Sequence, residues 1–253
     1  MLPFRTILIT ALATCAALSP ARAQTEASRK QLEFQAAGTT VKVEKFGPCI
    51  TRSCQKILIL SGSKGLRSKV YDDLGHAFQA AGLDPYLVHY LSEDDLARIS
   101  KAGGAKQRKA FYAERLAYWT TLVQSIASQL NGDQDKNNRI GILGISLGAQ
   151  VAYSAVTQSS AFGAIVLVDG GFPENHLPLR RALPPALLLW GSEDKIFSVS
   201  MAKKIQASTI QLGGSAALEI FDGGEHDFFL KHDTKDALQA HQKAAEFLTS
   251  TLK

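Results

Sequence analysis

Several features that mark specialised protein classes are missing from the sequence. No dense block of like charge appears, although 28 Lys and Arg outnumber 23 Asp and Glu, so nothing indicates a nucleic-acid partner. There is no internal repeat, low-complexity tract or linker, and the composition excludes a disordered or fibrous protein. With 45% hydrophobic residues over 253 positions, the chain is long enough for one globular domain with a proper core.

No apolar run reaches the roughly 20 residues that a membrane-spanning helix needs. The run Thr6–Leu18 follows the single positive charge of Arg5, and Ala21 and Ala23 then supply the A-x-A spacing that signal peptidase accepts. These features predict a signal peptide over residues 1–23. We therefore expect a periplasmic or secreted protein without stable membrane insertion of the mature chain.

The sequence contains only three cysteines, which limits the disulfides and metal sites that cysteine could form. Cys15 ends the sequence LATC, an alternative lipoprotein box that Thr14 fits poorly. Cys49 and Cys54 remain after cleavage, and in an exported protein we expect them to form a disulfide that closes a small loop. A single C-x4-C pair without a nearby histidine lacks the four ligands of a structural zinc site, so no metal is predicted.

Short aliphatic runs dominate the rest of the chain. An alternating segment, residues 39–46, is typical of a half-exposed strand. Six continuous runs follow it, and continuous apolar runs suit strands buried on both faces of a parallel sheet. These runs are residues 56–62, 83–90, 139–145, 162–171, 186–191 and 217–224.

Stretches with helical spacing lie between these runs. They cover residues 68–82, 107–132, 147–156, 200–210 and 234–252. Alternating strands and helices predict an α/β fold, in which helices cover both faces of a mostly parallel central sheet. We expect residues 24–253 to form a single domain with no large lid.

The sequence GISLG at Gly144–Gly148 fits the G-x-S-x-G nucleophile elbow. In this motif a tight turn from a strand into a helix strains the serine backbone and pushes the hydroxyl of Ser146 into the cleft. Glycine is needed on both sides, since a Cβ there would collide with the neighbouring strand or helix. The context agrees, because an aliphatic run precedes Ser146 and a helical pattern follows it.

From about Val41 to Leu252 the chain resembles an α/β-hydrolase, and it is similar to the dienelactone hydrolase and small carboxylesterase branch. The resemblance places the catalytic acid at Asp194 in GSED and the histidine at His226 in GGEHD. Two rivals for the acid remain. Asp169 ends the preceding aliphatic run, where some hydrolases carry the acid, and Glu193 adjoins Asp194.

The predicted chemistry assigns one role to each group. Ser146 is the nucleophile, His226 takes its proton, and Asp194 holds the imidazole in the correct tautomer. The backbone N–H groups of Leu147 and Ser63 are the expected oxyanion hole. The mechanism implies no cofactor and no metal, and its partner is a small-molecule ester.

Two departures from the dienelactone hydrolases narrow the expected activity. Their elbow carries cysteine, whereas this chain has Ser146, which favours an ordinary esterase. The common HG of the oxyanion loop is replaced by Ser61–Gly62, leaving the second N–H donor open. An amide or thioester hydrolase with the same triad, or a binding protein that has lost catalysis, are the alternatives.

The sequence assigns no catalytic role to two further groups of residues. Residues 93–109 are either a cap over the cleft or a charged connection. Phe111, Tyr112, Tyr118 and Trp119 are interpreted as helix packing. No pattern in the sequence fixes the substrate or the oligomeric state.

Overall fold

A computed structural model describes residues 29–48, 54–132, 139–172 and 179–252 of the chain. The predicted signal peptide, residues 1–23, lies outside the described residues. So does Cys49, half of the predicted disulfide. Both therefore remain predictions.

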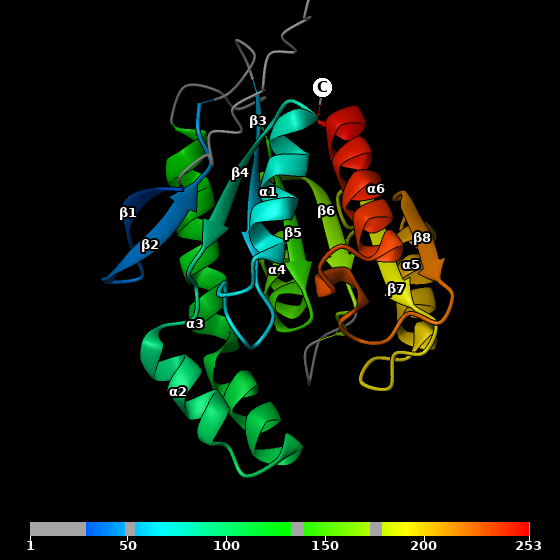
Figure 1. The fold of residues 1–253 in the computed structure, drawn as a ribbon, viewed down its shortest axis with the longest axis horizontal. Coiled ribbons are helices and arrows are strands. Elements are labelled where there is room, and N and C mark those ends of the chain that lie inside the picture. Colours follow the sequence, from blue (N-terminus) through cyan, green and yellow to red (C-terminus); the bar gives the residue numbers. More distant parts are fainter. Residues whose placement is uncertain (1–28, 49–53, 133–138, 173–178, 253) are drawn as a thin grey trace, which may run out of the picture.

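A single sheet of eight strands forms the centre of the molecule (Figure 1), in the order β1-β2-β4-β3-β5-β6-β7-β8. The strands from β3 to β8 are all parallel, whereas β1 and β2 run antiparallel at one edge. The strands are β1 (Lys30–Ala36), β2 (Thr39–Lys45), β3 (Gln55–Leu60), β4 (Leu83–Val88), β5 (Ile140–Ile145), β6 (Phe162–Val168), β7 (Ala186–Gly191) and β8 (Ala216–Phe221).

Six α-helices and one short 3-10 helix are present in the described residues. They are α1 (Val70–Ala80), α2 (Glu93–Lys101), α3 (Ala105–Asn131), α4 (Leu147–Gln158), α5 (Val199–Gln211), η1 (Phe228–Leu230) and α6 (Lys235–Thr251). The predicted α/β fold with a mostly parallel sheet is confirmed.

Helices cover both faces of the sheet because its central strands are apolar on both sides. In β3, Leu58 and Leu60 belong to the core under α3, α4 and α5, whereas Ile57 and Ile59 belong to the core under α1 and α6. All four residues are fully buried. Figure 1 shows α1 and α6 in front of the sheet and α4 behind it.

The two edges of the sheet depart from the sequence-based expectations. Strand β1 was not predicted, because its polar residues hide a weak alternation in which Leu32 and Phe34 are the apolar positions. Strand β8 was expected to be buried on both faces, but it is an edge strand, and Ile220 is 46% exposed. An edge strand has only one strand neighbour, so its side chains, which point to the two faces of the sheet, have fewer neighbours to bury them.

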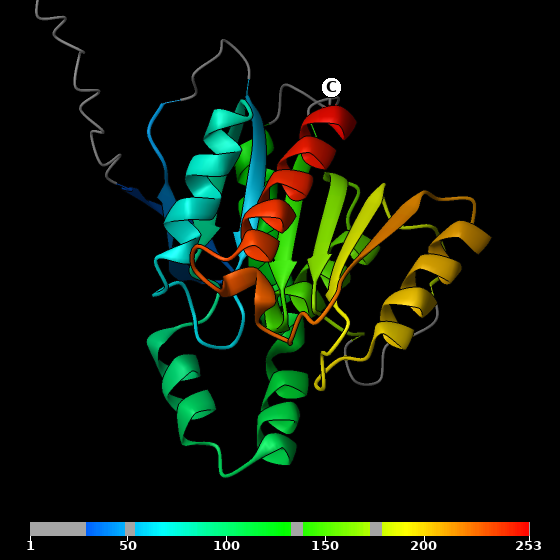
Figure 2. The same ribbon diagram turned by 45° about the vertical axis from the view of Figure 1, so that its right-hand side comes forward.

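For residues 93–109, a cap and a charged connection were the two alternatives. These residues form α2 and the start of α3, and we call α2 together with the first turns of α3 the hairpin. Helix α2 begins with a capping box, in which Ser92 Oγ accepts from the N–H of Asp95 and the Asp95 carboxylate accepts from the N–H of Ser92. The chain turns before Gly104 and continues into α3. Figures 1 and 2 show α2 and the first turns of α3 extending past the carboxyl ends of the parallel strands.

None of the helices in the described parts of the chain has the length and apolar character needed to span a bilayer.

Candidate active site

Ser146 lies in the turn that joins β5 to α4, and its backbone is strained. Its φ of 53° and ψ of −110° belong to a conformation that residues with a side chain rarely adopt. The turn is held by the N–H of Ser146, which donates to the carbonyl of Val168 at 2.9 Å. This strained turn leaves the Ser146 side chain at the carboxyl edge of the sheet.

The glycines on either side of Ser146 are required by close backbone approaches. A Cβ built on Gly144 would lie 2.3 Å from the carbonyl oxygen of Gly148. A Cβ on Gly148 would lie 2.4 Å from the carbonyl oxygen of Leu60. Both distances are too short for real atoms, so α4 packs against β5 and β3 only because these positions lack side chains.

His226 lies in the loop between β8 and η1, far from Ser146 in the sequence but next to it in space. The distance between Ser146 Oγ and His226 Nε2 is 2.9 Å. The imidazole is 27% exposed, and the ring of Phe197 lies against it with 5.7 Å between ring centroids. The histidine is therefore close enough to Ser146 to exchange a proton with it.

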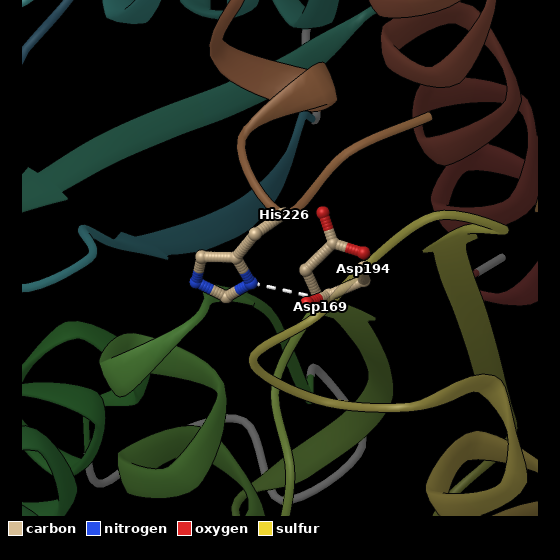
Figure 3. Close-up of side chains that lie close together, drawn as sticks. All are labelled: Asp169, Asp194 and His226. Carbon is tan, nitrogen blue, oxygen red and sulfur yellow. Dashed lines mark hydrogen bonds and ion pairs between the residues drawn. The ribbon is translucent and has the colours of Figure 1, made fainter. Parts of the chain in front are cut away.

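Asp194 contacts the other nitrogen of the same ring (Figure 3). Its Oδ2 lies 2.9 Å from His226 Nδ1. Its Oδ1 accepts hydrogen bonds from the N–H groups of Ile196 at 2.7 Å and Phe197 at 2.9 Å. The side chain is fully buried, so the turn after β7 fixes the carboxylate in place. An unbroken chain of contacts thus runs from Ser146 through His226 to Asp194.

The two rival acids occupy different positions. Asp169 follows β6, and one of its oxygens accepts from the N–H of Gly191 at 3.0 Å. Burial, with the nearby charge of Asp194, raises the pKa of Asp169 to about 8. Glu193 is exposed and lines a surface depression that His226 also borders, but no hydrogen bond joins the two among the described contacts. Of the three acids considered, Asp194 is the one within hydrogen-bond distance of His226.

The two predicted oxyanion donors flank Ser146. Leu147 is the first residue of α4, where a backbone N–H has no partner within the helix. Ser63 lies in the turn after β3 and lines the same cavity as Ser146. The turn is held close to the elbow, because a Cβ on Gly62 would lie 3.6 Å from the Cβ of Ser146. The hydroxyl of Tyr90 also holds this turn, because it donates a hydrogen bond to the carbonyl of Ser61 at 2.8 Å.

A cavity of about 360 Å³ opens at Ser146 and His226. Its lining comes from the hairpin, the turn after β3, the elbow with α4, the segments after β6 and β7 including α5, and the loop after β8. Its charged residues apart from the histidine are basic, Arg108 and Lys109, and its described lining contains no Asp or Glu. The lining comprises Ser63, Ala105, Arg108, Lys109, Tyr112, Ala113, Leu116, Ser146, Leu147, Gln150, Phe172, Ile196, Phe197, Met201 and His226.

The sequence left open whether residues 93–109 cap the cleft, and Ala105, Arg108 and Lys109 of this segment line the cavity. Phe111 packs against Trp119 with 5.8 Å between ring centroids, and Tyr112, also interpreted from the sequence as helix packing, lies against Trp119 at 6.4 Å and lines the cavity as well. A usable signal was present, because Ser92 precedes Asp95 at the spacing of a capping box. That signal predicts a helix start at residue 93 but not the direction in which the helix points.

Asp169, Asp194 and His226 also form a group of potential metal ligands, with one donor atom from each within 4.8 Å of the others. An ion bound through Nδ1 of His226 would have to break the contact of that nitrogen with Asp194. The other oxygen of Asp194, Oδ1, in addition accepts hydrogen bonds from two backbone N–H groups. We therefore interpret the group as a hydrogen-bonded cluster and assign no metal to it.

Solved structures of several hydrolases share this fold. A dienelactone hydrolase from Anabaena variabilis is 18% identical with a TM-score of 0.72, covering 89% of this chain and 99% of that chain. A cold-adapted esterase from an Arctic intertidal metagenomic library is 12% identical with a TM-score of 0.67, covering 92% of this chain and 97% of that one. A puromycin-hydrolyzing peptidase from Mycobacterium tuberculosis is 18% identical with a TM-score of 0.72, covering 93% of this chain and 41% of the peptidase.

Sequence comparison places the chain more specifically. No curated protein sequence matches it. The model of the dienelactone hydrolase family matches residues 95–253, which include the elbow, Asp194 and His226. This match spans more than half of the chain, and the fold of the solved dienelactone hydrolases agrees with it. The chain belongs to the dienelactone hydrolase family of α/β-hydrolases.

Proposed function

We propose that the protein is a serine hydrolase that cleaves a carboxylic ester through an acyl-enzyme. The observation that carries this proposal is the chain of contacts from Ser146 to His226 to Asp194, with 2.9 Å at each step. A serine hydroxyl is a weak nucleophile unless a base takes its proton as it attacks. Family membership supports the hydrolase class.

In the proposed reaction, Ser146 Oγ attacks the ester carbonyl while its proton moves to Nε2 of His226. The resulting imidazolium is stabilised by Asp194 at Nδ1, and it returns the proton to the leaving alcohol as the carbon–oxygen bond breaks. Water then attacks the acyl-enzyme with the same histidine as base, releasing the acid and restoring Ser146. The mechanism requires no cofactor and no metal.

The negative charge that develops on the carbonyl oxygen needs donors that are already in place. We assign this role to the N–H groups of Leu147 and Ser63, because both residues line the cavity beside Ser146. Backbone donors held by a helix start and a tight turn need no rearrangement during the reaction, and one such donor contributes about 3 kcal/mol.

Amide and thioester hydrolysis use the same triad, and one observation keeps the amide alternative in view. The similar solved structures include a puromycin-hydrolyzing peptidase and an acylaminoacyl peptidase. This chain, however, spans only 42% and 41% of those two chains, whereas it spans nearly the whole of a dienelactone hydrolase and an esterase. Ester hydrolysis is therefore the function that we favour over peptide hydrolysis and over a non-catalytic binding role.

Reaction with a fluorophosphonate probe and hydrolysis of p-nitrophenyl acetate test the proposal together. We expect the wild-type protein to be labelled and active, and Ser146→Ala to lose both properties. Ser63→Ala is the matched control, because Ser63 lines the same cavity and keeps its backbone N–H; it should still be labelled. A wild-type protein that neither reacts with the probe nor releases p-nitrophenol would support the binding-protein alternative instead.

Export is part of the proposal and depends on the sequence alone. We propose that cleavage after Ala23 releases the mature chain into the periplasm or the medium, where Cys49 and Cys54 become oxidised. Expression of the full chain followed by N-terminal sequencing should find Gln24 as the first residue. A mass that rises by two cysteine adducts only after reduction should accompany it, and free thiols in the exported protein would contradict the predicted disulfide.

A further inference from the structure

Asp169 is a second buried carboxyl group beside the proposed triad, and the proposed mechanism does not use it. The side chain is fully buried. Its Oδ1 accepts the N–H of Gly191, whereas Oδ2 has no hydrogen-bond partner among the described residues. One of its oxygens lies within 4.8 Å of a ring nitrogen of His226 and of an oxygen of Asp194. Figure 3 shows the three side chains together.

Two carboxyl groups this close to one another do not ionise equally. Asp194 is stabilised as a carboxylate by two N–H groups and by His226. Asp169 has a single N–H donor and is desolvated, and the negative charges of Asp194 and Asp227 act on it in addition. These effects raise the pKa of Asp169 to about 8, so Asp169 carries a proton at neutral pH.

The repulsion between the two carboxyl groups would disappear if Asp194 were replaced, and Asp169 could then ionise more easily. Removing the Asp194 carboxylate would remove the nearest negative charge from Asp169 and would leave Nδ1 of His226 without its acceptor. The vacated space borders Asp169, and a shift of about 2 Å would close a separation of 4.8 Å to hydrogen-bond distance. Asp169 is also placed to accept a hydrogen bond from His226, because, like Asp194, it follows a buried parallel strand and contributes an oxygen to the cluster of Asp169, Asp194 and His226.

We propose that Asp169 is a reserve acid, a positioning residue that takes over the orientation of His226 when Asp194 is absent. The inference rests on the proposed function. In the variant protein, Asp169 releases its proton to solvent before turnover and accepts a hydrogen bond from the Nδ1–H of His226. His226 then takes the Ser146 proton at Nε2 as before, so the bonds that form and break in the substrate are unchanged.

Removal of Asp194 tests this inference by a double-mutant comparison. We expect Asp194→Ala to lower kcat/KM for p-nitrophenyl acetate about 100-fold, and the double variant Asp194→Ala with Asp169→Asn to lower it about 10⁴-fold, as loss of a triad acid does elsewhere. Asp194→Ala combined with Asp227→Asn is the matched control. Asp227 also adjoins His226, but its side chain is 58% exposed, and we expect no further loss.

The pH profile separates positioning from a structural role. In Asp194→Ala, kcat/KM should reach its plateau at a higher pH than in the wild type, because buried Asp169 must first lose its proton. Adding Asp169→Asn should abolish that shift. Asp194→Ser serves if Asp194→Ala does not fold, because a serine hydroxyl also accepts the N–H groups of Ile196 and Phe197.

Two results would overturn the inference. One is equal activity of Asp194→Ala and the double variant, with both folded by circular dichroism. The other is a pH profile of Asp194→Ala identical to that of the wild type. Failure of the proposed function is distinguishable, because in that case the wild-type protein itself would not react with a fluorophosphonate at Ser146, and the inference would fall with it.

Discussion

The cavity wall that carries Ser146, Asp194 and His226 is built from turns at the ends of the parallel strands, whereas the hairpin of α2 and α3 builds another wall. The first is fixed by backbone contacts that allow no side chain at Gly144 or Gly148. The second stands beyond the sheet, and its buried side chains include Asp95, Ile99 and Phe111.

Asp95 fastens the hairpin through several hydrogen bonds. Its carboxylate accepts from Trp119 Nε1 at 3.0 Å, from Arg115 Nε at 3.0 Å and from the N–H of Ser92 at 3.1 Å. Burial alone would raise the pKa of Asp95, but these donors lower it below its usual value. We propose that the strand ends perform the chemistry and that the hairpin selects the substrate.

The largest effect is expected at the strand ends. His226→Ala removes the proposed base, and we predict a fall in kcat of at least about 10⁴-fold, with little change in KM. Steady-state kinetics with p-nitrophenyl esters measures this. His232→Gln is the control, because His232 is exposed and contacts Asp73 instead. Activity of His226→Ala within tenfold of the wild type would refute the proposed base.

The second-largest effect is expected from Asp95, the buried side chain that holds the hairpin by hydrogen bonds. Asp95→Ala leaves Trp119 and Arg115 without their acceptor, and we predict a loss of about 3 kcal/mol in the free energy of unfolding. Because the triad lies on the other wall, KM should rise by about tenfold while kcat falls less. Urea titration and steady-state kinetics check both numbers. A variant with a collapsed kcat and an unchanged KM would show that the two walls are not independent.

A smaller effect is expected from Arg108, which is half-buried and lines the cavity beside Ser146. With two basic residues and no acidic residue in the described lining, the hairpin should favour an ester whose acyl chain ends in a carboxylate. We predict that Arg108→Gln lowers the preference for p-nitrophenyl hydrogen glutarate over p-nitrophenyl butyrate by about tenfold, or about 1.4 kcal/mol.

Lys106→Gln is the matched control for Arg108→Gln. Lys106 is exposed on the same hairpin and does not line the cavity. Its substitution should change the preference by less than about twofold at moderate salt. Equal effects of the two variants would mean that the hairpin acts only through its overall charge.

The smallest effect concerns stability at the strand ends. The folded protein keeps a proton on Asp169 up to about pH 8, whereas an unfolded Asp loses it near its ordinary value of 3.8. Folding therefore binds a proton between these two values, and the contribution of Asp169 to stability falls as pH rises through that window. In Asp169→Asn this loss is absent, so its Tm should drop less than the wild-type Tm from pH 5 to pH 6, by about 4 °C. Identical drops, measured by differential scanning calorimetry, would contradict the raised pKa.

The fold was largely predictable from the sequence because the central strands are apolar on both faces. Residues 57–60 are a continuous aliphatic run, and such a run fits a strand covered by helices on both sides. The edge strand β1 was missed because Lys30, Gln31 and Glu33 mask the alternation of Leu32 and Phe34. Edge strands keep polar side chains in solvent, so their pattern carries less information.

The sequence predicted those site residues whose backbone is fixed by a motif. It left open the residues whose position depends on the three-dimensional arrangement of distant segments. The elbow around Ser146 follows from the glycines. Asp169 and Asp194 both follow buried strands, so the residues alone left both acids open. The family resemblance favoured Asp194, and which carboxylate reaches His226 is decided by the fold. The position of Arg108 in the cavity depends on the direction of the hairpin, which is set by the contacts of Asp95 with residues about 20 positions further along.

The most direct test of the proposed chemistry is the location of a fluorophosphonate adduct by peptide mass spectrometry. We predict one adduct per chain, on the peptide that contains Ser146, and a rate of labelling that falls by orders of magnitude in His226→Ala. An adduct on any other residue, or labelling of Ser146 at the same rate without His226, would contradict it.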